Sequence, residues 1–157
     1  MSLDALFSEL TEANEVLGDI EDRLIISSAC SLIQPYHIKL DQLREQSDNL
    51  TKIGTTGRGI GTSYEDKVGR RSVRISDLYD ERKLNDKLTQ ALDFYNSIFE
   101  HSFGASKIDL NELLDLNLKQ AERLKPYVGN VIEEIRELQK SKKKILYEGA
   151  QGALLDV

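Results

Sequence analysis

Apolar residues recur at helical spacing along most of this chain, and this period constrains the fold more than any other feature. The longest such stretch covers residues 80–140, where Asp80 and Asp109 can each cap a helix and Pro126 is expected to kink or interrupt the pattern. A similar stripe begins at Leu3 and is closed by Gly18, and another helix can start after Pro35. The period therefore predicts a mainly α protein.

Two short segments break the helical pattern. Residues 23–29 (RLIISSA) and 145–147 (ILY) are short, apolar and rich in β-branched or aromatic side chains, which favours strands. Two lone strands are not stable by themselves. We expect them either to pair with each other or to join a sheet whose other strands lie outside this chain. The predicted fold class is mainly α with a few short strands.

Composition narrows the class of protein. The chain has 157 residues, a net charge of −6 and a single cysteine, Cys30, so no internal disulfide is expected. His37 and His101 show no metal-ligand spacing, and each is interpreted as a helix-surface residue or a core residue with satisfied hydrogen bonds, while Cys30 is interpreted as a small buried apolar residue. No apolar run approaches the roughly 20 residues of a membrane helix, and no signal peptide is recognisable. We expect a cytoplasmic protein that binds neither membranes nor, given its acidic balance, nucleic acid in general.

Residues 54–74 (GTTGRGIGTSYEDKVGRRSVR) form a glycine-rich, cationic loop in this acidic chain. The segment fits neither the dinucleotide-binding pattern GxGxxG nor a Walker loop. Glycines let backbone amides approach an anion, and Thr55 and Thr56 add hydroxyl donors. After the glycines come four cations at i, i+3, i+4 and i+7, which would share one face of a helix: Lys67, Arg70, Arg71 and Arg74. The pattern indicates a phosphate or carboxylate site, with a solvated basic face or an inter-subunit ion pair as the alternatives.

The C-terminal segment carries a second motif. The strand-like residues 145–147 run directly into Glu148-Gly149-Ala150-Gln151-Gly152, where two glycines bracket a glutamine. Such an arrangement can bring backbone and one amide side chain close to a ligand, although a plain turn uses the same residues. The chain then stops in mid-pattern, which suggests a cut.

The two motifs together resemble a known family. The stretches IGTTGRGIGTSYEDKVGRRSVRISDL and YEGAQGALLD are similar to two signature stretches of adenylosuccinate synthetase, and the similarity extends over essentially all residues from about Leu3 onward. Three positions depart from the family pattern: Thr62 replaces the usual proline, Ser72 a frequent glycine and Ala153 the usual threonine. These departures bear on the rigidity of the loop more than on the family.

The resemblance implies that residues 1–157 are the central, largely helical part of a larger α/β, P-loop-like enzyme. That enzyme uses GTP to phosphorylate the 6-oxygen of IMP, and the aspartate amine then displaces the phosphate to give adenylosuccinate. The family's N-terminal GDEGKGK segment, with the catalytic aspartate and the Mg²⁺ site, is not in this chain, and neither is the C-terminal region. The ligands for Mg²⁺ and GTP are therefore expected mostly outside these residues, and the isolated chain is expected to be inactive.

The resemblance also assigns roles to individual residues. Thr56 matches a threonine that contacts IMP, and Gln151 matches a glutamine that hydrogen-bonds the base near its reacting oxygen. Arg70 matches an arginine that reaches the IMP phosphate of the neighbouring subunit, which implies a homodimer with shared sites. Lys67 and Arg58 receive supporting electrostatic roles. The implied function of residues 54–74 is that of an IMP-phosphate loop, with no catalytic or metal-binding residue in the chain.

Two other functional hypotheses are compatible with the residues. The first is a non-catalytic helical domain that dimerises or binds a partner. The second is an RNA-contacting module that uses the basic residues, but Tyr64 is the only aromatic among them that could stack on a base.

Overall fold

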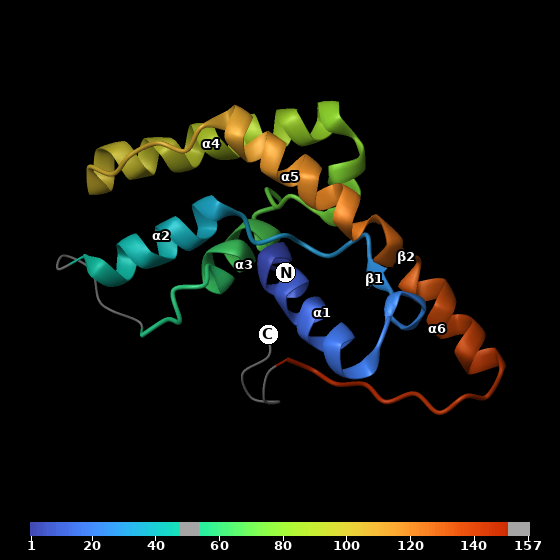
Figure 1. The fold of residues 1–157 in the computed structure, drawn as a ribbon. Coiled ribbons are helices and arrows are strands. Elements are labelled where there is room, and N and C mark those ends of the chain that lie inside the picture. Colours follow the sequence, from blue (N-terminus) through green and yellow to red (C-terminus); the bar gives the residue numbers. More distant parts are fainter. Residues whose placement is uncertain (48–53, 151–157) are drawn as a thin grey trace.

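The structure, a computed structural model, describes residues 1–47 and 54–150 and is mainly helical (Figure 1). Its six helices and two short strands are α1 (Leu3–Leu17), β1 (Ile26–Ser27), α2 (Pro35–Gln46), α3 (Ile60–Val68), α4 (Glu81–Phe103), α5 (Leu110–Leu124), β2 (Val128–Gly129) and α6 (Val131–Lys140). Single 3-10 turns lie at Glu21–Arg23 (η1), Ile75–Tyr79 (η2) and Lys125–Tyr127 (η3). The prediction of a mainly α protein with a few short strands is confirmed.

The long helices α4 and α5 lie side by side (Figure 1) and carry much of the apolar core. Both predicted caps are confirmed: Asp80 accepts a hydrogen bond from the amide of Lys83 (3.0 Å), and Asp109 accepts from the amides of Asn111 and Glu112 (2.8 and 3.0 Å). The inward faces pack at helical spacing, with Leu84, Leu88, Leu92, Tyr95 and Phe99 buried on α4 and Leu113, Ala121 and Leu124 buried on α5.

The helical region 80–140 is interrupted at Pro126, as predicted. Helix α5 ends at Leu124, and the chain passes through η3 and the two residues of β2 before α6 begins at Val131. Proline has no backbone N–H to donate and its ring clashes with the preceding turn, so a helix cannot continue undisturbed through it. The break redirects the chain toward the N-terminal half.

The two strands pair with each other in parallel, with Ile26 opposite Val128 and Ser27 opposite Gly129. Of the predicted strand 23–29, only two residues form strand, and its partner is β2. A Cβ on Gly129 would lie 2.7 Å from Cγ2 of Ile25, so a larger residue there would have to displace the Ile25 side chain.

Residues 145–147, predicted as a strand, do not form one in this structure, and pairing with strands outside this chain stays a prediction. Residues 143–149 have no regular secondary structure, and Leu146 and Tyr147 are 89% and 68% exposed. A strand exists only where a neighbouring strand satisfies its backbone groups, and β1 and β2, the two strands of the described ranges, pair with each other. The apolar and aromatic composition of residues 145–147 does not by itself supply a neighbouring strand with which to pair.

A second extended contact brings the cationic segment into the core. The amide of Leu32 donates to the carbonyl of Val73 (2.8 Å), and the amide of Ile75 donates to the carbonyl of Cys30 (3.1 Å). Val73 and Ile75 are completely buried. The chain that leaves the cationic segment is therefore fixed between the 30–33 segment and the helices.

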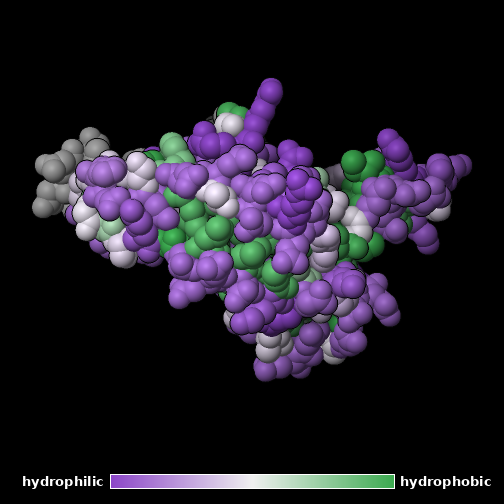
Figure 2. All heavy atoms as spheres, turned by 90° about the horizontal axis from the view of Figure 1, so that it is seen from above, coloured by the Kyte–Doolittle hydropathy of each residue, from purple (hydrophilic) through white to green (hydrophobic). Residues whose placement is uncertain are grey.

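Apolar side chains also reach the surface. Figure 2 shows hydrophobic groups at the end of the molecule where α6 lies in Figure 1, and α6 has no buried residue, with Ile132 64% exposed. Within the described ranges, no helix combines the length and apolarity needed to cross a membrane.

Candidate anion-binding site

Carboxylates of α2 hold the glycine-rich loop in place. Asp41, which is almost fully buried, accepts hydrogen bonds from the Thr55 hydroxyl and the Gly59 amide, both at 2.9 Å. Glu45, one helical turn further along α2, accepts from the amide of Gly54 at 3.1 and 3.2 Å. Two of the loop amides expected to face an anionic ligand thus contact anions of the same chain.

Gly59 joins the loop to α3. It is the N-cap of α3, with a left-handed φ of 74°, and a Cβ there would lie 2.7 Å from the amide nitrogen of Ile38. No L side chain fits without displacing the backbone of α2. This glycine sets the close packing of α3 against the first turn of α2.

The residues predicted to bind substrate lie at opposite ends of α3. Thr56 and Arg58 are exposed just before the helix, and Lys67 is exposed in its last turn, with Nζ 5.2 Å from the centre of the Tyr64 ring. Arg70 is exposed two residues beyond the helix and has a left-handed φ of 61°. Gln151 lies outside the described residues.

The predicted cationic face of a helix is wrong. Helix α3 ends at Val68, so Arg70, Arg71 and Arg74 follow it in a turn and an extended segment. The reason is the turn that follows, in which Arg70 is left-handed and the amide of Arg71 donates to the carbonyl of Asp66 (2.9 Å), five residues back. The side chains of Lys67, Arg70, Arg71 and Arg74 therefore do not share one face of a helix.

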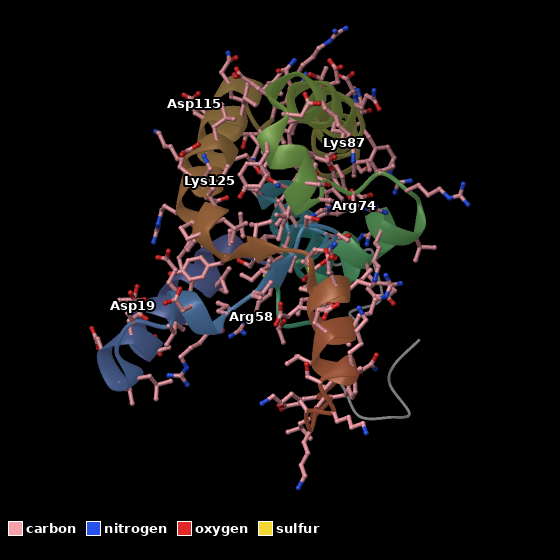
Figure 3. All side chains as sticks on the ribbon, turned by 90° about the vertical axis from the view of Figure 1, so that its right-hand side faces the viewer. Asp19, Arg58, Arg74, Lys87, Asp115 and Lys125 are labelled. Carbon is pink, nitrogen blue, oxygen red and sulfur yellow. The ribbon has the colours of Figure 1, made fainter. Side chains whose placement is uncertain are left out.

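Three of these cations, Lys67, Arg70 and Arg74, line two hollows in the surface. One, of about 430 Å³, is lined by Lys67 together with Cys30, Ile60, Ser63 and Tyr64, among others. The other, of about 310 Å³, is lined by Arg70, Ser72, Arg74, Ser76, Asp77, Lys83 and Lys87. They share no lining residue, and in Figure 3 Arg58 lies well away from Arg74 and Lys87. The nine residues of α3 span about 13 Å, so Thr56 and Arg70 of one chain are well separated.

A buried polar cluster beneath α3 was not predicted from the sequence. The Asp66 carboxylate, fully buried, lies 2.9 Å from Nε2 of His37 and 2.9 Å from both Nε and Nη2 of Arg71, and Tyr95 is a further hydrogen-bond partner. The backbone amide of Gln34 donates to Nδ1 of His37 (3.0 Å), so Nε2 carries the proton that His37 donates to Asp66. The interpretation of His37 as a core residue with satisfied hydrogen bonds is confirmed.

The charge of Asp66 is stabilised by these partners. Burial by itself would raise the pKa of Asp66, but the hydrogen bonds from His37, Tyr95 and Arg71 and the electrostatic effect of His37 lower it below its usual value. The same burial and the nearby Asp66 charge raise the pKa of Tyr95. Asp66 is therefore an ionised carboxylate at the junction of α2, α3 and α4.

A second buried carboxylate lies below the Arg70 hollow. Asp77 contacts Nζ of Lys83 and Lys87 at 2.8 and 2.6 Å and accepts from the amide of Arg74 at 2.8 Å. Burial would raise the pKa of Asp77, but these contacts lower it. Lys87 also donates to the carbonyl of Ser72 at 3.1 Å, which ties α4 to the residues that follow Arg70.

Two of the three departures from the family pattern make buried contacts. The Thr62 hydroxyl lies 2.9 Å from the carbonyl oxygen of His37 and 3.1 Å from that of Gly59, and the Ser72 hydroxyl lies 3.2 Å from that of Ser31. Here, both hydroxyls join the cationic segment to its neighbours. The third departure, Ala153, lies outside the described residues.

The described residues do not fit a metal ion. Within those ranges, no group of three or more His, Cys, Asp or Glu side chains is placed to hold one. Of the three buried aspartates in these ranges, Asp66 and Asp77 are already surrounded by cations and hydrogen-bond donors, and Asp41 accepts hydrogen bonds from Thr55 and Gly59.

Comparison with known proteins identifies the family. The family model of adenylosuccinate synthetase matches residues 1–157, which is the whole chain. The chain belongs to the adenylosuccinate synthetase family. It is 46% identical over 157 residues to adenylosuccinate synthetase 1 of Burkholderia lata and also 46% identical to the adenylosuccinate synthetase of Burkholderia mallei.

A solved structure shares the fold. The structure of fully ligated adenylosuccinate synthetase from Plasmodium falciparum superposes with a TM-score of 0.80 and 25% sequence identity, covering 99% of this chain and 35% of that one. The chain likewise spans 35% of the length of each Burkholderia relative. In this family, these 157 residues thus correspond to a largely helical part of a longer α/β enzyme.

Proposed function

We propose that this chain is the IMP-binding central segment of an adenylosuccinate synthetase, which joins IMP to aspartate with GTP in the synthesis of adenine nucleotides. Thr56 contacts IMP, Gln151 hydrogen-bonds the base near the 6-oxygen, and Lys67 and Arg58 contribute positive potential. Arg70 binds the IMP phosphate of the neighbouring subunit through charge-assisted hydrogen bonds. Mg²⁺ and GTP bind to parts of the enzyme outside this segment, where Mg²⁺ would neutralise charge on the transferred phosphoryl group. We expect a cytoplasmic homodimer.

One observation supports the division of labour between subunits. Arg70 and Lys67 line separate hollows, and α3 holds Thr56 and Arg70 at opposite ends. A single chain thus presents Arg70 away from its own Thr56, which suits an arginine that serves the site of a partner subunit. In a two-fold dimer the same patch is presented twice, so both sites receive the same contribution.

A mixed-subunit experiment tests this function in the full-length enzyme. Arg70→Leu is expected to weaken IMP binding by about 1.5 to 3 kcal/mol, roughly 10- to 100-fold, because it removes hydrogen bonds to a charged phosphate. Arg70→Leu subunits are then mixed with subunits that lack only the N-terminal catalytic aspartate. One site of the mixed dimer then carries both defects and the other carries neither, so part of the activity should return.

Two results would contradict the proposal. Wild-type full-length protein that forms no adenylosuccinate from IMP, aspartate, GTP and Mg²⁺ would exclude the enzyme activity. Activity that stays at the level of the unmixed variants after confirmed subunit exchange would exclude a role of Arg70 across the interface.

A further inference from the structure

Beside the contacts of Lys87 and Ser31 with Ser72, the turn that presents Arg70 is held by Asp66. Its backbone carbonyl accepts hydrogen bonds from the amides of Arg71 (2.9 Å) and Ser72 (3.2 Å), and its carboxylate binds the Arg71 guanidinium through Nε and Nη2. The main chain and the side chain of Asp66 thus hold Arg71 and Ser72, the two residues that follow Arg70.

The Arg71 side chain runs back over the turn to reach this carboxylate. A Cβ on Gly69 would lie 2.8 Å from Nη1 of Arg71, which shows how closely the guanidinium passes over the glycine. The guanidinium carbon also lies 5.0 Å from the centre of the Phe94 ring on α4. With Arg71 turned inward, the neighbouring Arg70 takes a left-handed backbone and an outward side chain.

A left-handed conformation is unfavourable for a residue with a side chain, so surrounding contacts must maintain it. Asp66 supplies such contacts on the C-terminal side of Arg70, and it is itself fixed by His37 on α2 and Tyr95 on α4. Three helices therefore fix the turn from which the Arg70 side chain extends.

We propose that Asp66 is a positioning residue for substrate binding: through Arg71 and the 69–72 turn it holds Arg70 in the orientation that receives a phosphate from the neighbouring subunit. This inference rests on the proposed function, since it assigns Asp66 an effect on IMP only through Arg70. It adds to that function a buried residue that touches no substrate.

The test uses the full-length enzyme and steady-state kinetics. Asp66→Asn keeps the size of the side chain but removes the charge that Arg71 binds, and we expect KM for IMP to rise roughly 5- to 10-fold, with kcat changed less. KM for GTP should stay near the wild-type value. Arg71→Gln, which changes a half-exposed side chain, should raise KM for IMP in the same way and keeps the test valid if Asp66→Asn folds poorly.

A double-variant cycle separates positioning from general damage to the fold. If Asp66 acts through Arg70, then Asp66→Asn combined with Arg70→Leu should have nearly the KM for IMP of Arg70→Leu alone. Glu65→Gln is the matched control, because Glu65 is the adjacent carboxylate on α3 and pairs at the surface with Arg44 (2.7 Å); its KM for IMP should equal that of wild type.

The outcomes distinguish this inference from the proposed function. Active wild-type enzyme with an unchanged KM for IMP in Arg71→Gln and in any folded Asp66→Asn would overturn the positioning role alone. Effects that multiply fully in the double variant would also overturn it. Inactive wild-type enzyme would instead refute the proposed function.

Discussion

The inward faces of α4 and α3 differ in chemistry. The buried residues of α4 are apolar or aromatic, whereas those of α3 are Thr62, Ser63 and Asp66. Apolar burial is non-directional and roughly proportional to area, so it stabilises α4 without demanding one orientation. Hydrogen bonds and ion pairs require specific geometry, so the contacts of α3 fix its direction. The apolar region supplies stability, and the polar region determines where Thr56, Lys67 and Arg70 lie.

The largest expected effect follows from removing part of the apolar face. Leu88 is completely buried on α4, and Leu88→Ala should lower the free energy of unfolding by about 2 to 5 kcal/mol, since it loses transfer energy and leaves a cavity. Ser63→Ala on α3 removes one hydrogen bond, to the carbonyl of Leu32 at 3.3 Å, and should cost only about 0.5 to 1.5 kcal/mol. Urea unfolding measures both. Equal losses would show that the two faces contribute to stability alike.

The dependence of the free energy of unfolding on acid pH tests the contribution of the polar face of α3. The pKa of Asp66 is lower in the folded protein than in the unfolded chain, where it is about 3.9. The ionised carboxylate therefore stabilises the fold fully above that unfolded value, and its contribution is lost as the pH falls through the lower folded pKa. The free energy of unfolding should decrease across the acid range in wild type.

Two variants test whether Asp66 causes the decrease in the free energy of unfolding at acid pH. Asp66→Asn should show a shallower fall of unfolding free energy with decreasing pH, while Leu88→Ala, although less stable at every pH, should keep the wild-type slope. Asp77, which also has a lowered pKa, accounts for part of the slope that remains in Asp66→Asn. An Asp66→Asn slope identical to wild type would contradict the role given to its charge.

The smallest effect is expected where the two kinds of packing meet. Tyr36 and Tyr95 stack with ring centres 4.5 Å apart, but the fully buried Tyr36 hydroxyl has no hydrogen-bond partner within the described ranges. Tyr36→Phe should leave the free energy of unfolding within about 1 kcal/mol of wild type or raise it, because no hydrogen bond is lost. Tyr95→Phe, which removes a partner of Asp66, should be destabilising. A clear loss of stability in Tyr36→Phe, measured by urea unfolding, would reveal a partner for its hydroxyl.

The same difference explains what the sequence could predict. Helical periodicity located α1, α4 and α5 and the caps Asp80 and Asp109, because apolar spacing and capping are local signals. It did not locate the contacts of Asp66 with His37 and Tyr95. His37 lies 29 positions before Asp66 and Tyr95 lies 29 positions after it, so neither contact gives a local signal. A charged residue on an otherwise amphipathic helix gives no indication of whether it is buried.

Local signals also misplaced two features. The spacing of Lys67, Arg70, Arg71 and Arg74 predicted one helical face, but the helix ends at Val68, and Arg70 takes a left-handed backbone. The apolar triplet at 145–147 predicted a strand, but pairing depends on a distant neighbour, and Val128–Gly129 occupies the side of β1 that pairs in the structure. The roles of Thr56, Arg58, Lys67, Arg70 and Gln151 came from motif resemblance, and all of them stay predictions.

The short parallel contact between β1 and β2 has a consequence for the order of folding. It joins Ile26 to Val128, residues 102 positions apart (128 − 26), whereas α4 and α5 are neighbours in sequence. Closing so long a loop costs chain entropy that only later contacts repay. We therefore expect α4 and α5 to dock early and the β1–β2 pairing to form late. An N-terminal segment released from a ribosome would then have to wait for residue 128 before it could be fixed in place.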